Sequence, residues 1–261
     1  MKTMKLMLLT ATFVFAATGA FAYELGKNDP NRDGHMATIQ IIHNSPDPAA
    51  ASVDIYVNGG AMPAIEDLDF RAATGLVELP ADVDLEVGIA PGSSMGPEDI
   101  IATWTFNLPA GSQTVVMASG VLGSDFDLFT NELLIGAKTD VAILAFHGAP
   151  DAPAVDVGAE GVGTLITNLM YQTFQGYLSV PAADYTLTIA PTGGEPIAAF
   201  IAPLSGVGGN SLVVFASGYL GEDPGFGLFA ALNDGTVLEL TPDNSVATEE
   251  VSLDDVKAMF R

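Results

Sequence analysis

The fold is decided by a short motif that occurs twice, and its first copy reads Ile39-Gln40-Ile41-Ile42-His43-Asn44-Ser45-Pro46-Asp47. The second copy reads Ala142-Ile143-Leu144-Ala145-Phe146-His147-Gly148-Ala149-Pro150-Asp151. In each copy an apolar run ends at a histidine, a Pro-Asp turn follows, and a second run opens with Val-Asp, at Val53-Asp54 and at Val155-Asp156. The apolar, partly β-branched runs favour strands, and Pro and Asp favour the turn between them. The motif therefore predicts two copies of one strand–turn–strand unit.

The repeat extends well beyond this motif. Leu68-Asp69-Phe70 matches Leu169-Met170-Tyr171, Ile89-Ala90-Pro91 matches Ile189-Ala190-Pro191, and residues 118–123 match residues 216–221. The offset between the copies falls from 104 to 98 residues along the chain, so the copies differ by small loop deletions. A repeat of this length has the size of a domain and not that of a solenoid unit of roughly 20–50 residues. We place the two domains at 37–139 and 140–242.

Each copy has the pattern of a β-rich domain, in which apolar runs alternate with Gly, Pro, Asn and Asp at short intervals. The expected strands are 39–43, 53–57, 85–90, 101–108 and 114–119 in the first copy and 142–147, 155–157, 185–190, 197–201 and 212–217 in the second. Residues 82–87 alternate polar and apolar side chains, which is typical of a half-buried strand. Many short strands separated by turns indicate an all-β fold of two tandem antiparallel β-sandwich domains of the immunoglobulin-like kind.

The first 22 residues have the pattern of a secretory signal peptide. Lys2 and Lys5 precede an apolar stretch, and Ala20-Phe21-Ala22 fits the small-x-small cleavage pattern. An uncleaved membrane anchor is the alternative, but the apolar stretch is short for a membrane span. We expect a secreted protein, extracellular or periplasmic, that starts at Tyr23 and has no transmembrane segment after signal cleavage.

The segments on either side of the repeats are acidic. Residues 23–36 form an acidic linker before the first domain, and residues 243–261 form an acidic tail after the second. In the tail, Ser252-Leu253-Asp254-Asp255 resembles a capping box with Asp in place of Glu or Gln. Val256, Met259 and Phe260 follow at helical spacing, so we expect a short C-terminal helix.

The composition excludes several classes of function. The chain of 261 residues has 8 Lys+Arg, 32 Asp+Glu and no Cys, and its formal net charge is −24. Its hydrophobic content of 49% is too high for a disordered acidic chain. The lack of cysteine excludes disulfides and thiol chemistry, and the excess of carboxylates argues against nucleic-acid binding. Without Lys2 and Lys5 the net charge is −26, which favours solubility through self-repulsion and attracts cations.

The two histidines of the motif and their neighbouring aspartates are the candidate site residues: His43, Asp47, Asp54, His147, Asp151 and Asp156. In one interpretation each histidine is a metal ligand or a general base beside a carboxylate, which would make the protein a metal-dependent hydrolase. In the other, the ring is half-buried and pins the turn through hydrogen bonds. The appearance of the same set in both copies favours the structural interpretation, because a single active site needs only one set.

Two further motifs resemble known sites. Residues 92–96, Gly-Ser-Ser-Met-Gly, fit the nucleophile elbow G-x-S-x-G, but Pro97 and a strand-like run follow where the elbow needs a helix, so we expect a hairpin loop. Asp29, Asn31 and Asp33 fit the first half of a calcium loop, D-x-N-x-D-G. The twelfth position is Gln40 and not the Glu of an EF-hand. The alternatives are a calcium site of another type, built from these three residues, and a solvated linker.

Two pairs of phenylalanines recur at matching places in the copies. Phe126 and Phe129 follow Gly123, and Phe226 and Phe229 follow Gly221. We expect them to pack in the cores or between the domains. An exposed stripe for ligand stacking is the alternative.

The motif, with its later Ala-Pro and Ala-Ser-Gly elements, resembles domain of unknown function 4397. The resemblance covers about 39–240, although Ala50-Ala51-Ser52 lengthens the first spacer and Gly158 stands where the first copy has Tyr56. It implies an exported, β-rich module in tandem copies and no established activity. We therefore expect a non-enzymatic protein that binds an extracellular polymer or protein. The alternatives are a calcium-stabilised structural module and the metal-dependent hydrolase.

Overall fold

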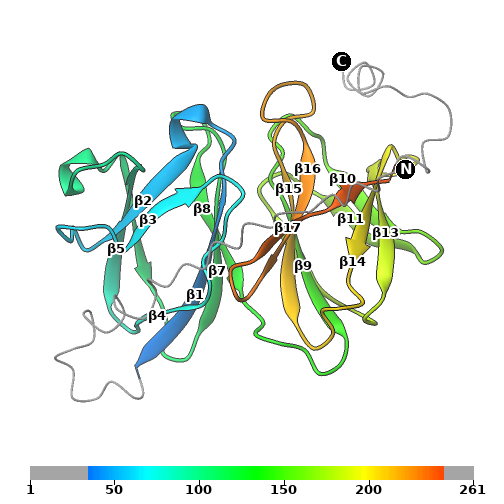
Figure 1. Cartoon of the computed structure of the whole chain (residues 1–261), viewed down its shortest axis with the longest axis horizontal. Helices are drawn as coiled ribbons and strands as arrows, with labels where there is room; N and C mark the ends of the chain where they lie inside the picture. The colour runs from blue at the N-terminus through cyan, green and yellow to red at the C-terminus, as the bar shows by residue number, and fades with distance from the viewer. Residues whose placement is uncertain (1–34, 244–261) are drawn as a thin grey trace, which may run out of the picture.

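The computed structural model describes residues 35–243, which form two β-sandwiches joined by the segment 133–140 (Figure 1). Repeat 1 contains β1 (Met36–Asn44), η2 (Pro48–Ala50), β2 (Ser52–Val57), β3 (Ile65–Asp69), β4 (Val77–Pro80), β5 (Asp84–Pro91), η3 (Pro97–Asp99), β6 (Ala102–Asn107), β7 (Gln113–Ser119) and β8 (Asp127–Glu132). One of its sheets has the strand order β4-β1-β7-β8 and the other β3-β2-β5-β6. The pair β1–β7 is parallel, whereas the other neighbours in these sheets are antiparallel.

Repeat 2 has the same plan with one addition. It contains β9 (Val141–His147), β10 (Val155–Ala159), β11 (Gly163–Leu169), β12 (Phe174–Val180), β13 (Asp184–Pro191), β14 (Ala198–Pro203), β15 (Ser211–Ser217), β16 (Gly227–Leu232), β17 (Val237–Glu239) and β18 (Thr241–Pro242). Its sheets have the orders β12-β9-β15-β16-β17 and β11-β10-β13-β14-β18. β17 and β18 therefore extend the two sheets along the side where repeat 1 ends at β8 and β6.

The all-β expectation is confirmed. Each of the ten expected strands is present within a few residues of its expected bounds, whereas β3, β4, β8, their counterparts β11, β12 and β16, and β17 and β18 were not expected. The expectation of purely antiparallel sheets is wrong, because β1 pairs with β7, and β9 with β15, in parallel. The expected C-terminal helix and the N-terminal segments lie outside the described residues. Within residues 35–243 no helix has the length and apolar character needed to cross a membrane.

β9 explains why the second copy of the motif is apolar without alternation. All seven of its residues are buried. Successive side chains of a strand point to opposite faces, so both faces of β9 must be covered. Ile143 lies in the core of repeat 2. Leu144 and Phe146 belong to a third apolar cluster, which lies between the repeats.

This third cluster joins the sheet β4-β1-β7-β8 to the sheet β12-β9-β15-β16-β17, which face each other in Figure 1. Its buried members come from both repeats: Ile42, Val115, Met117, Leu133, Leu144, Phe146, Val213, Phe215, Phe229 and Ala231. Polar bonds cross the same interface. Gln40 Nε2 donates to Leu232 O (2.6 Å), and Asn44 Nδ2 donates to Ala216 O (3.0 Å). The two sandwiches are therefore packed against each other through a desolvated interface.

The expectation for the recurring phenylalanines is confirmed. Phe126 and Phe226 pack against the cores of their own repeats. Phe129 and Phe229 belong to the cluster between the repeats. Core and interdomain packing thus account for all four rings.

Candidate functional site

Both motif histidines are buried and hold the loop that follows their own strand. His43 has no exposed surface, and its Nε2 lies 2.6 Å from Ala50 O. His147 is 1% exposed, and its Nε2 lies 2.9 Å from Pro153 O. A carbonyl can only accept, so Nε2 carries the proton in both rings. Each histidine therefore pins the connection between the first two strands of its repeat.

Burial also keeps these rings neutral. It lowers the pKa of His43, against the opposing effects of the Ala50 carbonyl and the charge of Asp69. It lowers the pKa of His147 against the Pro153 carbonyl. In the described part of the chain neither ring is hydrogen-bonded to a carboxylate. The structural interpretation of the two histidines accounts for this geometry, and a histidine–aspartate pair does not form.

Asp47 and Asp151 connect two loops in each repeat. Asp47 accepts hydrogen bonds from Ala49 N (2.8 Å) and from Leu122 N (3.0 Å). Asp151 accepts from Leu220 N (2.8 Å) and Gly221 N (3.1 Å). Each carboxylate thus ties the loop after the first strand to the Gly-x-Leu-Gly loop after the strand that pairs with it in parallel.

Asp54 and Asp156 make a second set of equivalent hydrogen bonds. They lie in the sheets β3-β2-β5-β6 and β11-β10-β13-β14-β18. Asp54 Oδ1 accepts from Asp67 N (2.9 Å), and its Oδ2 accepts from the hydroxyl of Ser94. Asp156 accepts from Asn168 N (2.8 Å) and Gly193 N (2.9 Å). These bonds, with that from Gly193 first, lower the pKa of Asp156.

The G-x-S-x-G motif lies in the loop between β5 and β6, as expected. Ser94 donates to Asp54, and the hydroxyl of Tyr56 lies 2.8 Å from Ser94 Oγ. A serine that donates to a structural carboxylate and has no histidine partner is not an activated nucleophile. This serine therefore fixes the loop.

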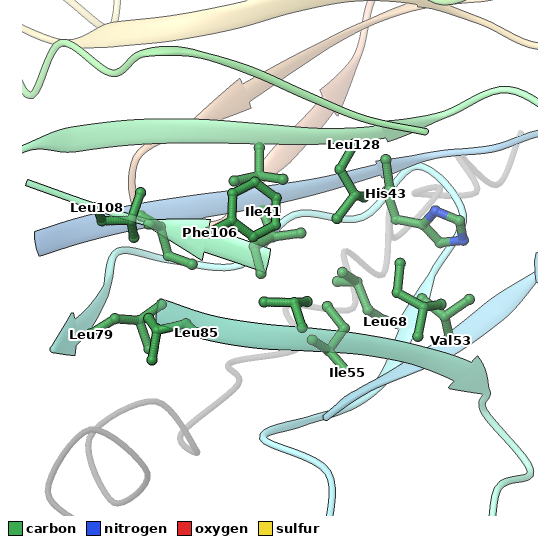
Figure 2. Close-up of a pocket in the computed structure, with 15 residues that line it drawn as sticks. Ile41, His43, Val53, Ile55, Leu68, Leu79, Leu85, Phe106, Leu108 and Leu128 are labelled. Carbon is green, nitrogen blue, oxygen red and sulfur yellow. The ribbon is translucent and has the colours of Figure 1, made fainter. Parts of the chain in front are cut away.

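The cavities of the two sandwiches are small and apolar. Repeat 1 has a cavity of about 40 Å³ between its sheets, and Figure 2 shows His43 at the end opposite Leu79 and Leu108. The matching cavity of repeat 2 measures about 100 Å³ and is lined by His147, Phe226 and other mainly apolar side chains. Pockets for small-molecule ligands usually measure roughly 300–1,000 Å³. Neither cavity has the size or the polar groups of a catalytic pocket.

No group of three or more metal-ligating side chains occurs among residues 35–243. The candidate calcium ligands Asp29, Asn31 and Asp33 lie outside the described residues. A calcium site at these residues stays a prediction.

The loops of both repeats gather at one end of the molecule, the upper end in Figure 1. We call this region, formed by residues 45–51, 120–126, 148–154 and 218–226, the end surface. It is strongly acidic. Burial raises the pKa of Tyr219 in this surface, and so do the charges of four surrounding carboxylates: Asp47, Glu222, Asp151 and Asp125. Because these carboxylates come from both repeats, one negative field spans the seam between the sandwiches.

Two residues that sequence reasoning missed hold the seam together. Arg71 Nη2 donates to Gly225 O (2.5 Å), and Gln172 Nε2 donates to Asp125 O (2.9 Å). Arg71 and Gln172 follow the aligned residues Phe70 and Tyr171, and both have a positive φ, 66° and 58°. Their acceptors also occupy equivalent places in the two copies, so the contacts are reciprocal, as in a two-fold symmetric dimer.

The feature of the sequence that could have singled out Arg71 is its positive charge. Residues 35–243 contain only two Lys or Arg side chains, Arg71 and Lys138. The guanidinium of Arg71 also donates to Ser217 Oγ (3.0 Å) and lies 4.4 Å from the ring centre of Phe229. A rare cation in so acidic a region is a sign of a specific internal partner.

Comparison with known proteins identifies the family. A family model described as a domain of unknown function (DUF4397) matches residues 37–158 and, a second time, residues 141–239. The chain belongs to the DUF4397 family. This confirms the resemblance carried by the repeated motif.

The other comparisons assign no activity. A search of the curated proteins found no match. Among solved structures, the chain is similar to one described as "Alpha-glucan binding by a streptococcal virulence factor", with 10% identity, 70% of this chain and 93% of that chain covered, and a TM-score of 0.23. A second is described as "Alpha-glucan recognition by family 41 carbohydrate-binding modules from streptococcal virulence factors", with 12% identity, coverage of 73% and 96%, and a TM-score of 0.22. Similarity at this level identifies no ligand of this chain.

Proposed function

We propose that this DUF4397 protein is exported and acts without catalysis, as a binding or structural module of the cell surface, the matrix or the periplasm. The observation that carries the proposal is the use of the motif residues. Each of the six histidines and aspartates hydrogen-bonds a loop of its own repeat. The repeated motif is thus occupied in holding loops, and these loops are what the fold presents to a partner.

Export is supported by the sequence. Residues 1–22 have the order of charges, apolar residues and small residues of a signal peptide. The mature chain would have no cysteine and a large negative charge. We further propose that each sandwich is immunoglobulin-like, which its two packed sheets with loops at the ends support.

The end surface is the proposed binding surface. It combines loops from both repeats, and the packed interface holds the two loop sets in a fixed relation. Its carboxylates favour an extracellular polymer or protein that carries positive charge or binds through cations. Two equivalent loop sets also allow a repeated ligand to engage both copies at once.

The test is a binding screen with the mature chain 23–261, immobilised, against cell-envelope polymers and secreted proteins. The test variant combines Asp125→Asn and Glu222→Gln on the end surface. The matched control combines Asp82→Asn and Asp84→Asn in the turn before β5 and at its start, at the opposite end. We expect the test variant to bind more slowly and the control to bind as the wild type does, because charges near an interface mainly change the association rate. Equal loss in both variants, or turnover of a bound polymer, would contradict the proposal.

A further inference from the structure

A segment near the end of repeat 2 closes one side of its sandwich. Residues 237–243 first pair with β16, with Leu238 opposite Ala230, and then pair with β14, with Thr241 opposite Ile201. Leu240 lies at the crossing between the sheets. It is 2% exposed, packs in the core of repeat 2, and its N donates to Leu228 O (2.9 Å). The segment therefore covers two strand edges and fills the core with one leucine.

The equivalent side of repeat 1 is open. In the described part of the chain β8 and β6 are the last strands of their sheets, because the chain after β8 continues into repeat 2. The burial of matching residues shows the difference. Ala230 is 1% exposed, whereas its counterpart Thr130 is exposed. Phe200 is 4% exposed, whereas its counterpart Trp104 is only half-buried.

The open side combines features that an incoming strand needs. No strand among residues 35–243 pairs with the outer edges of β6 and β8. The half-buried side chains of Leu128, Trp104 and Phe106 lie at the edge of the core of repeat 1. Extended peptides that add to a sheet edge gain affinity from main-chain bonds and specificity from side-chain pockets. Repeat 2 shows such a segment in place on the same fold.

We propose that the β6–β8 side of repeat 1 is a strand-acceptor site and that its occupant is the segment 23–29 of a second copy of this chain. The first argument is the sequence of the segment. Leu238-Glu239-Leu240 closes repeat 2, and Tyr23-Glu24-Leu25 has the same order of an apolar residue, a glutamate and a leucine. In this alignment Leu25 takes the place of Leu240 between the sheets.

Chain length favours a second copy as the donor. The segment that closes repeat 2 runs antiparallel to β16, so a donor in the same orientation leads away from the start of β1. If the donor belonged to the same chain, its linker would have to reach back to Met36 at the start of β1. This path is set by the length of β7 and the width of about three strands, and measures roughly 25–30 Å. The six residues between Asp29, where the donor segment ends, and Met36 span at most about 25 Å when fully extended. A donor from another copy has no such return to make.

The consequence is head-to-tail assembly. Each copy offers one donor segment and one acceptor site, and these are different surfaces. Such a heterologous contact propagates into rings or open chains instead of closing as a dimer. The proposal does not depend on binding at the end surface, because the end surface consists of loops and the acceptor site consists of the strands β6 and β8.

The first test measures the mass of the mature chain 23–261 by analytical ultracentrifugation over a range of concentrations. Two variants are compared with it. Leu25→Asp puts a charge where the proposal buries a leucine, and Leu253→Asp makes the same change in the C-terminal tail. We expect the wild type and Leu253→Asp to form species larger than the monomer, and Leu25→Asp to lose them. A monomeric wild type, or loss of the larger species in Leu253→Asp and not in Leu25→Asp, overturns the proposal.

The second test uses Trp104, the single tryptophan of the chain, as a reporter at the acceptor site. Its Nε1 donates to Asp127 Oδ1 (2.7 Å), so the ring bridges the two acceptor strands. A synthetic peptide of residues 23–34 is added to the Leu25→Asp protein, and a peptide with the same Leu25→Asp change serves as the control. We expect the wild-type peptide to shift the Trp104 emission to shorter wavelength in a saturable way and to protect the ring from acrylamide. No response, or an equal response to both peptides, overturns the proposal.

Discussion

Replacing Gly148 with alanine tests the interface between the repeats at a single contact. Gly148 follows β9, and its N donates to Ala216 O (3.2 Å). A Cβ at this position would lie 2.0 Å from Asn44 Nδ2 and 2.9 Å from Ala216 O. Asn44 belongs to the other repeat, is fully buried, and donates to the same Ala216 carbonyl. The added methyl group therefore has to displace the Asn44 side chain.

The expected cost follows from these contacts. Overpacking a well-filled site costs about 1–3 kcal/mol. Leaving the buried amide of Asn44 without its carbonyl adds about 1–3 kcal/mol. We expect Gly148→Ala to lower the free energy of unfolding by about 2–6 kcal/mol. Asn44→Ala alone should cost only roughly 1 kcal/mol, because Ala216 O keeps its bond from Gly148 N.

A double-mutant cycle separates this contact from a general loss of stability. In the Asn44→Ala background the new methyl group of Gly148→Ala still meets the Ala216 carbonyl and Phe146 Cε1 (3.1 Å) but no longer meets the Asn44 amide. The second substitution should therefore cost roughly 1–2 kcal/mol less than it does alone. Urea unfolding, followed by circular dichroism and by Trp104 fluorescence, measures all four proteins. Gly206→Ala is the control, since a Cβ at Gly206 meets nothing within 4 Å. Additive effects of the two substitutions, or wild-type stability of Gly148→Ala, would refute the reasoning.

Three further predictions concern the motif and the calcium loop. Burial lowers the pKa of His43 and His147 in the folded chain. Below about pH 6.5 the unfolded chain therefore binds more protons than the folded chain does. The free energy of unfolding should then fall by up to about 1.4 kcal/mol per pH unit for each histidine. The variant with both histidines replaced by glutamine should have a flatter melting temperature between pH 7 and pH 5. Asp151→Ala should speed amide exchange at the two loop residues whose N–H groups it binds, seen by NMR, while exchange in β9 stays unchanged. If Asp29 and Asp33 bind calcium, millimolar Ca²⁺ should raise the melting temperature of the mature chain and leave that of Asp29→Ala/Asp33→Ala unchanged.

Local pattern was enough to predict the central strands. β1, β5, β7 and their counterparts are apolar or alternate regularly, because each lies against at least one core. Except for β16, which is an apolar strand between β15 and β17, the strands that were missed lie at sheet edges. β3 reads Ile-Glu-Asp-Leu-Asp and β8 reads Asp-Leu-Phe-Thr-Asn-Glu, and both are partly exposed. An edge strand gains its order from pairing with a neighbour, which the sequence of the strand itself does not record.

The sequence singled out the histidines and aspartates of the motif, but it did not predict their hydrogen-bond partners. A histidine followed by Pro and Asp indicates a turn, and in the structure His43 Nε2 lies 2.6 Å from Ala50 O in the chain that follows it. The partner of Asp47 at Leu122 lies 75 residues away, and the partner of Arg71 at Gly225 lies 154 residues away. Contacts of this range depend on how the two sheets and the two repeats stack, and spacing along one strand carries no information about them.

The interface between the repeats and the open side of repeat 1 have one common cause, the path of residues 133–140. In repeat 2 the chain after the equivalent strand turns back and closes its own sandwich. In repeat 1 it leaves and binds the other repeat. Leu134 N donates to Tyr177 Oη (2.8 Å), and Leu134 O accepts from Ser211 Oγ and from Asn233 Nδ2 (3.3 Å). In repeat 2 the backbone groups of this segment therefore pair with sheet edges of their own sandwich. In repeat 1 the backbone groups of the equivalent segment bond to the other domain instead. The difference between the two similar copies therefore follows from the path of this segment, which in repeat 1 leads directly into β9 of repeat 2.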